Sequence, residues 1–251
     1  MMEDMEKPGF RKTFLRIVIF LCGHIILALG LTLNTKINLG VAPIISVAYS
    51  VAQIWNLDFA NTTFCWFSVL ILVQIVLLLI KRTDGWKKKS AIVCLQFAAN
   101  FISTRFIALF TNLLPVFDGS IPGRLLLMIL AIILTGIGAS MSLFTRIVPN
   151  PGDGVVQGIS DFTGIRIGTT KNLFDTFCVC ITLTISLVFT HSVIGIGIGT
   201  LATLLGVGRV VALFDRVFGS KIRNLVVVPS SMEDTSGQSE RKPEHIESEH
   251  R

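Results

Sequence analysis

The sequence predicts an all-α polytopic membrane protein of about six transmembrane helices plus two re-entrant half-helices in an inverted 3+3 repeat. Three observations predict this class. Of the 251 residues, 51% are hydrophobic and the mean hydropathy is +0.71, well above that of a globular domain. Apolar runs of about 20 residues recur, the length that crosses a ~30 Å hydrocarbon core. Two shorter apolar segments each follow a break that contains glycine and proline.

The six long apolar runs are the predicted spans. They cover 14–33, 62–80, 91–114, 124–145, 172–190 and 192–214. The first run is long and lacks an A-x-A site, so we expect a span there and not a cleaved signal peptide. The predicted units are a cytoplasmic N-terminal segment 1–13, a first membrane repeat 14–114, a second membrane repeat 124–220, and a disordered cytoplasmic tail 229–251.

A shift of the chain by 110 residues aligns its two halves. The shift places Thr35-Lys36-Ile37 on Thr145-Arg146-Ile147, Pro43 on Asp153, and Ser50 on Ser160. Each half then contains one break and one short segment, 44–55 in the first half and 155–163 in the second. About twelve residues make only ~18 Å of helix, too short to span. Paired breaks in two halves indicate the binding site of a transporter.

Charge predicts the topology. Lys and Arg gather in the segments 7–16, 81–89, 146–171 and 216–223, while few lie in the other loops. The positive-inside rule therefore places these segments and both termini in the cytoplasm, with both short segments re-entrant. Each half then has three spans, an odd number, so the second half is inverted. The basic residues flank apolar spans, which argues against nucleic acid as the partner and for the lipid bilayer of a bacterial cell membrane.

The chemistry is expected at the two breaks, because the N-terminus of a half-helix presents unpaired N–H groups and a partial positive charge. Pro43 and the run Pro151-Gly152-Asp153-Gly154 are typical of helix starts, with Asp153 as the expected N-cap. The candidate substrate-binding residues are Lys36, Pro43, Arg146, Asp153, Gln157, Ser160 and Asp161. Lys36 and Arg146 either attract an anion or anchor the interface. Asp161, whose mate in the repeat is Val51, is a candidate for proton or cation binding.

Other polar residues of the spans have simpler interpretations. His24 is either a functional group at membrane depth or a neutral side chain bonded within the protein. Gln96 and Asn100 share a helix face, and Lys171 is expected to pair with Asp175, four residues on. Arg105 is either a ligand or a side chain that reaches the interface. The cysteines have no metal spacing, and no nucleophile–base pair occurs in the spans, so we expect no metal, no cofactor and no enzyme.

Three runs resemble the YczE/YyaS/YitT-like family of bacterial integral membrane proteins: NLGVAPIISV, NPGDGVVQGISDFTGIRIGTTKNLFD and GIGTLATLLGVGRVV. The resemblance covers roughly residues 14–220. It implies a multi-pass plasma-membrane protein and little biochemistry, since the family is largely uncharacterised, although some members are linked to production or export of secreted peptides. The sequence departs from the family where a charged residue is expected before the Gly-Thr of the last span, because Ile198 stands there.

Two function classes follow. The first is a secondary transporter of a small solute, with its site between the two half-helices; two opposed helix N-termini favour an anionic group on that solute. The second is a non-transporting accessory or substrate-binding subunit of another membrane complex, for example one that supports secreted-peptide production or export. The expected partners are therefore a small molecule and the bilayer, with a homo-dimer or a membrane partner protein as further candidates.

Overall fold

The computed structural model describes residues 10–81, 86–145, 147–219 and 222, with the side chains of residues 10, 12 and 86–89 outside the description. The described residues form α-helices and one π-helical turn, with no strand. The helices are α1 (Phe10–Lys36), α2 (Pro43–Ile54), α3 (Phe59–Lys81), α4 (Trp86–Leu113), α5 (Ile121–Thr145), α6 (Pro151–Thr163), α7 (Ile167–Thr190), α8 (Ile198–Phe214) and the turn η1 (Asp215–Gly219). The predicted tail 229–251 lies outside the described residues.

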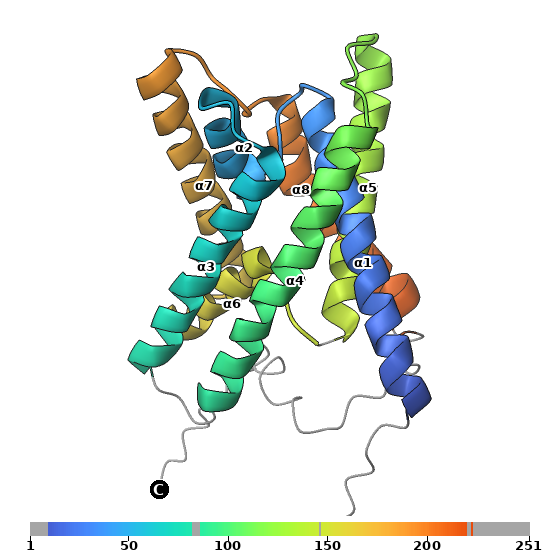
Figure 1. The fold of residues 1–251 in the computed structure, drawn as a ribbon, viewed down its shortest axis with the longest axis vertical. Helices are drawn as coiled ribbons and strands as arrows, with labels where there is room; N and C mark the ends of the chain where they lie inside the picture. Colours follow the sequence, from blue (N-terminus) through green and yellow to red (C-terminus); the bar gives the residue numbers. More distant parts are fainter. Residues whose placement is uncertain (1–9, 82–85, 146, 220–221, 223–251) are drawn as a thin grey trace, which may run out of the picture.

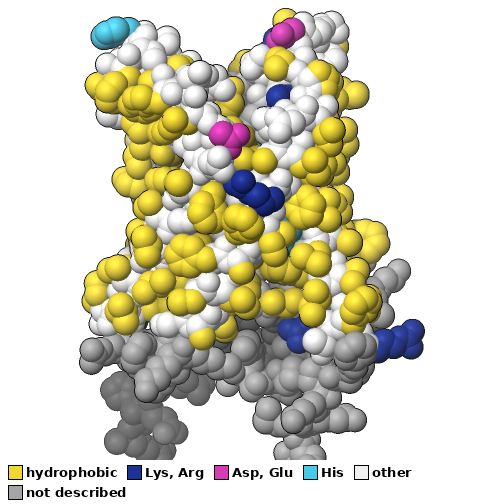
Figure 2. Space-filling model, in the orientation of Figure 1, with side chains coloured by type: hydrophobic (Ala, Val, Ile, Leu, Met, Phe, Trp, Pro, Cys, Tyr) yellow, Lys and Arg dark blue, Asp and Glu magenta, His cyan; other side chains and the backbone are white. Residues whose placement is uncertain are grey.

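Among the described residues, six helical segments are long and apolar enough to cross a membrane: α1, α3, α4, α5, α7, and α8 together with η1. Hydrophobic side chains cover most of the face drawn in Figure 2, and charged side chains are few on it. Many large apolar residues of the six helices are exposed, as expected for surfaces that lipid covers. The prediction of a polytopic helical membrane protein is therefore confirmed.

The long helices of the bundle run between two ends (Figure 1). The short helix α2 lies toward one end and the short helix α6 toward the other, and we name the two ends after them. The α2 end holds the helix termini Lys36, Phe59, Leu113, Ile121, Thr190 and Ile198. The described helix termini therefore gather at two ends of the bundle.

Each half of the chain has four helices in the order long, short, long, long, and the packing of the helices can be compared between the halves. Helix α1 packs along α5, its counterpart in the other half. Helix α2 packs on α7 as α6 packs on α3, and α4 packs on α1 as α8 packs on α5. Each short helix thus packs mainly on the third helix of the other half, while the fourth helix of each half packs on the first helix of its own half. One pair has no counterpart: α4 packs closely along α3, whereas α8 is not similarly packed on α7.

Glycine allows the close approach of α1 and α5. A Cβ at Gly30 would lie 2.6 Å from the backbone nitrogen of Thr135, and one at Gly23 would lie 3.0 Å from the nitrogen of Ser142. Membrane helices that meet at small residues gain van der Waals contact and exclude lipid. Gly136 of α5 likewise leaves room for Val210 of α8, since a Cβ there would lie 2.5 Å from Val210 Cγ1.

The last predicted span starts later than expected, at Ile198 and not at Ser192. The preceding segment cannot continue as a helix, because Gly195 adopts a left-handed φ of +78°. The Gly195 carbonyl instead accepts a hydrogen bond of 2.8 Å from the Val41 nitrogen. A backbone hydrogen bond therefore joins the segment that precedes α8 to the segment that precedes α2.

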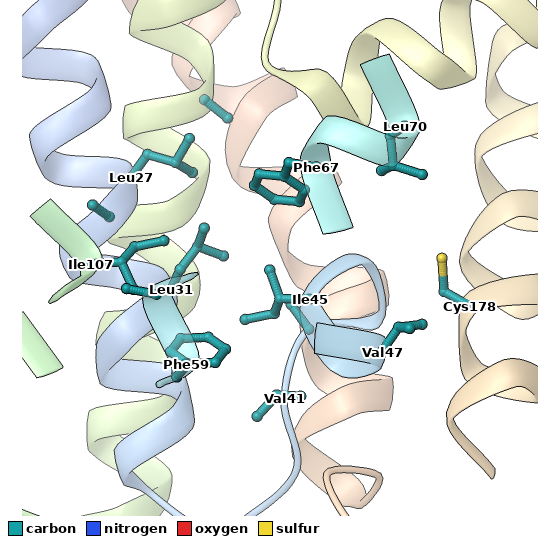
Figure 3. Close-up of a cluster of buried hydrophobic side chains, with 14 of the residues drawn as sticks. Leu27, Leu31, Val41, Ile45, Val47, Phe59, Phe67, Leu70, Ile107 and Cys178 are labelled. Atoms are coloured by element: carbon teal, nitrogen blue, oxygen red, sulfur yellow. The ribbon is translucent and has the colours of Figure 1, made fainter. Parts of the chain in front are cut away.

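An apolar cluster surrounds α2 and fixes its position (Figure 3). Ile45 of α2 is fully buried and lies near Leu31 of α1 and Phe67 of α3. Two polar contacts supplement this packing. Ser46 and Thr182 of α7 share a hydrogen bond of 2.7 Å, and the Trp66 indole donates to the Ile44 carbonyl at 2.8 Å.

Candidate functional site between the two short helices

The N-terminus of α2 is capped by a side chain from another helix. Pro43 is the first residue of α2, as predicted, so its missing N–H removes no helical bond. The Ala42 nitrogen just before it donates to the Asn34 Oδ1 of α1 at 2.9 Å. Asn34 Nδ2 in turn lies 3.4 Å from Thr203 Oγ1 of α8. Buried Asn34 therefore joins α1, α2 and α8 at one point.

The N-terminus of α6 is built differently. The helix begins at Pro151 with Asn150 as the N-cap, and the Asn150 side chain makes no capping hydrogen bond. The expectation that Asp153 is the N-cap is wrong: Asp153 is the third residue of the first turn, because proline takes the first position. Pro43 therefore corresponds to Pro151, and not to Asp153 as the 110-residue shift implied.

Two buried glutamines support the first turn of α6. Gln74 Nε2 of α3 donates to the Pro151 carbonyl at 3.2 Å, and Gln96 Nε2 of α4 donates to Gln74 Oε1 at 3.0 Å. Gly154 is required here, because a Cβ would lie 2.5 Å from Gln74 Oε1. Gln96 is 0% exposed, and its Oε1 atom has no hydrogen-bond partner among the described residues.

The first turns of the two short helices line one small cavity of about 70 Å³, which we call the central cavity. Pro43 and Ile44 contribute from α2, and Asn150 and Asp153 from the α6 side. Lys171 and Asp175 of α7 complete the charged part of the lining. The apolar part of the lining includes Leu27, Leu31, Phe67, Ala139 and Val207. Three ionisable side chains thus lie beside a space whose other lining is mainly apolar, with Thr135, Asn150 and Thr203 as the uncharged polar residues.

A second space, of about 350 Å³, adjoins the central cavity at the α6 end, and we call it the α6 groove. Asp153 and Lys171 line both spaces, so they stand where the two meet. The polar lining of the groove also includes Gln74, Gln96, Gln157 and Asp161. The groove therefore leads from the surface around the C-terminal half of α6 to the carboxylate of Asp153.

The ionisable groups at this junction are unequally paired. Lys171 Nζ lies 3.3 Å from Asp175 Oδ2, which confirms the predicted pair. Asp153 accepts no hydrogen bond from, and forms no ion pair within 4 Å with, any described residue. With both acids ionised, two negative charges face one positive charge.

The other predicted site residues lie farther from this cavity. Gln157 and Asp161 are exposed and line the α6 groove, and Gln157 Nε2 donates to Asp161 Oδ1 at 2.7 Å. The Ser160 hydroxyl donates to the Ile165 carbonyl at 2.6 Å, so it closes the C-terminal end of α6. Lys36 lines neither space. Arg146 lies outside the described residues, so its predicted role stays a prediction.

At the opposite end, the connections before α2 and before α8 pack closely together. The Gly199 nitrogen donates to the Leu39 carbonyl at 2.7 Å, beside the Val41–Gly195 bond. Gly40 has a left-handed φ of +104°, and a Cβ there would lie 2.5 Å from the Gly197 nitrogen. A pocket of about 300 Å³, which we call the α2 pocket, lies over these connections. It has no lining residue in common with the central cavity.

The other polar residues of the predicted spans contact groups within the protein. His24 Nδ1 lies 2.9 Å from the carbonyl of Phe20 in the same helix, and the ring lines neither the central cavity nor the groove. Arg105 contacts Asn61 Oδ1 at 2.6 Å and is exposed toward the α2 end. Gln96 and Asn100 share a face as predicted, and both bond to α3.

Sequence reasoning missed several residues of the site. Lys171 and Asp175 were expected only to pair, yet both line the central cavity. Asn34 and Gln74 were not selected, although Gln74 interrupts a run that is otherwise apolar from Val69 to Ile80. A buried amide in such a run has to find hydrogen-bond partners, and this is the signal that could have identified Gln74.

The bundle and its exposed apolar surface define a multi-pass helical membrane protein. Comparison with protein families then assigns the chain more narrowly: it belongs to a family of unknown function, DUF6198, whose model matches residues 14–216. No curated protein and no solved structure matches the chain. Membership of an uncharacterised family agrees with the expectation from the sequence, while the narrower YczE-like identity stays a prediction.

Proposed function

We propose that this chain is a secondary transporter of a small solute, with its binding site at the junction of the central cavity and the α6 groove. One observation carries the proposal: the interrupted starts of two short helices, from the two halves of the chain, line the same buried, charged cavity. Non-helical backbone at membrane depth is tolerated only where protein or a watery cavity satisfies it. In transporters built from repeats, such broken helices hold the solute near the midplane.

The proposal includes an inverted repeat in which α2 and α6 are re-entrant from opposite faces of the membrane. Its support is the exchange of packing partners between the halves and the positions of α2 and α6 toward opposite ends. Such a repeat has two equivalent routes to one site, one at each end. In this conformation the route at the α2 end is closed by the Leu39–Gly199 and Val41–Gly195 hydrogen bonds. The solute then exchanges through the α6 groove.

The charge of the solute depends on the groups at the junction. Two helix N-termini favour an anionic group, as the sequence suggested. However, Lys36 lines neither space, and Lys171 is already paired with Asp175. Asp153 adds a negative charge in the first turn of α6, where it offsets the positive end of that helix. The groups at the junction therefore favour a solute site but do not favour an anionic solute.

A second candidate function, that of an accessory subunit, is favoured by one observation. An almost wholly apolar groove of about 540 Å³ lies between α3, α6 and α7 on the surface that faces lipid. Its lining includes Trp66, Val73, Leu173, Phe174 and Phe177. A helix of a membrane partner or an acyl chain of a lipid would fit such a surface.

A ligand screen followed by a flux measurement tests the transporter proposal. The purified protein is screened by thermal shift against small metabolites of each charge class, because a ligand that binds the native state raises the melting temperature. Each hit is then tested for uptake into proteoliposomes. We expect a hit whose stabilisation and uptake are both lost in Asp175→Asn and kept in Asp118→Asn, a control at the α2 end. A hit that is never transported, together with a membrane protein that co-purifies in fixed ratio, would support the accessory function instead.

A further inference from the structure

The junction of the central cavity and the α6 groove presents hydrogen-bond acceptors that lack donors. Asp153, half-buried in the first turn of α6, has no hydrogen bond or close ion pair among the described residues. Gln96 Oε1 belongs to a side chain that is 0% exposed, lines the same groove and has no partner in the described part of the chain. A buried acceptor such as Gln96 Oε1 is costly without a donor, and the half-buried Asp153 carboxylate lines the same groove, so a ligand there is expected to supply donors to both.

With both acids ionised, the junction carries one negative charge that no cation within 4 Å balances among the described residues. Lys171 neutralises Asp175, which leaves the carboxylate of Asp153 without a cation of its own. An ionised carboxylate at membrane depth is stable only when it is paired or bonded to donors. The Lys171–Asp175 contact also shows that an ammonium group is accommodated here, with Nζ 3.3 Å from the carboxylate oxygen.

Beyond these groups the walls are mainly apolar, with Gln74, Gln157 and Asp161 as further polar lining of the groove. Leu78, Val93, Leu143 and Val156 line the groove, and Leu27 and Phe67 line the cavity beyond. Such walls do not replace the hydration shell of a bare metal ion, which requires several oxygen ligands. They do accept the hydrocarbon part of an organic cation, whose burial is favourable.

From these observations we infer that the junction binds a small primary alkylammonium solute. The ammonium group occupies the position beside Asp153 and donates to Asp153 and to Gln96 Oε1, while the alkyl chain lies against the apolar wall of the α6 groove. An ammonium has three N–H donors and one charge. The unsatisfied acceptor atoms are the two carboxylate oxygens of Asp153 and Gln96 Oε1, and Asp153 is the single unpaired carboxylate. This inference rests on the proposed solute site and names its substrate class.

Binding to purified protein in detergent tests the inference without requiring transport. The probe is n-butylammonium chloride, and the comparison solutes at equal ionic strength are n-butanol, sodium butyrate, tetramethylammonium chloride and sodium chloride. We expect n-butylammonium alone to raise the melting temperature, by a few degrees at a concentration well above its dissociation constant. Tetramethylammonium carries the charge without N–H donors, and n-butanol carries the alkyl chain without the charge.

Three variants locate the site. Asp153→Asn, which keeps the size of the side chain, should lose the n-butylammonium shift. Gln96→Leu, which keeps the charge, should bind about tenfold more weakly, as for the loss of one hydrogen bond to a charged group. Asp118→Asn should respond as the parent does. If Asp153→Asn does not fold, Gln96→Leu still tests the site, because its fold is judged by elution volume and helicity before titration.

Several outcomes would overturn the inference. They are the absence of an n-butylammonium shift in the parent, an equal shift in Asp153→Asn, an unchanged affinity in Gln96→Leu, or an equal shift with sodium or tetramethylammonium. If sodium butyrate alone raises the melting temperature, the solute is an anion and not an ammonium, and the proposal of a solute site still holds. Failure of the ammonium inference is thus distinguishable from failure of the transporter proposal, which is judged by the broader ligand screen and by uptake.

Discussion

The two short helices occupy equivalent places in the two halves of the chain but differ in chemistry. Helix α2 has no charged residue, most of it is buried, and Asn34 caps it from another helix. Helix α6 carries Asp153 and Asp161, its N-cap makes no side-chain hydrogen bond, and its C-terminal half is exposed to the α6 groove. Each half therefore has a short helix as its second element, but the two short helices differ in their polar residues. In this protein one half supplies a fixed wall and the other supplies the charged groups.

The largest effect is expected from the sidedness of the two ends, since labelling is all or none. In a background without the five native cysteines, Asp118→Cys lies at the α2 end and Arg166→Cys at the α6 end. The distribution of basic residues predicts that the α2 end faces outward. A membrane-impermeant maleimide applied to intact cells should label position 118, and position 166 only after permeabilisation. Labelling of both positions in intact cells would contradict opposite sidedness for α2 and α6.

The closed connection at the α2 end should be the least tolerant backbone in the structure. Gly40→Ala introduces a Cβ 2.5 Å from the Gly197 nitrogen at a φ of +104°. Left-handed strain and overpacking together should lower the free energy of unfolding by about 3 kcal/mol. Thermal unfolding in detergent measures the effect. The matched control is Gly119→Ala, where a Cβ would meet no atom within 4 Å, and a similar loss there would remove the significance of the Gly40–Gly197 contact.

The difference in capping between α2 and α6 can be measured with one pair of variants. Asn34→Ala removes the acceptor for the Ala42 nitrogen and should cost about 1–2 kcal/mol of stability, as lost caps do. Asn150→Ala removes an N-cap side chain that makes no hydrogen bond, and should cost less than about 0.5 kcal/mol. Chemical denaturation of both variants gives the comparison. Equal losses would mean that the two short helices begin in the same way.

The sequence was sufficient for the spans and for the two breaks, because apolar length and the positions of Pro43 and Pro151 are local properties. The contents of the cavity were harder to predict. Asp175 lies one turn from Lys171, and their spacing correctly predicts a pair, but only the packing of α7 on α2 and α6 shows that the pair lines the central cavity. Asn34 acts through Ala42 and Thr203, contacts that no periodicity indicates.

The smallest effect is expected at Asp161 of α6. The sequence suggested Asp161 for proton or cation binding and Asp153 for helix capping, but Asp153 is the less exposed of the two. Asp161 is exposed, lies near the C-terminal end of the helix, and its carboxylate already accepts a hydrogen bond from Gln157. Water screens its charge, so Asp161→Asn should change stability by less than about 0.5 kcal/mol. It should weaken n-butylammonium binding by only about twofold, and only at low ionic strength, where exposed charges still act over distance. Titration at low and at physiological salt measures this dependence, with Asp153→Asn as the buried counterpart. If Asp161→Asn loses as much n-butylammonium affinity as Asp153→Asn does, and the loss does not depend on salt, the charged group of the solute binds at the last turn of α6 and not at the first.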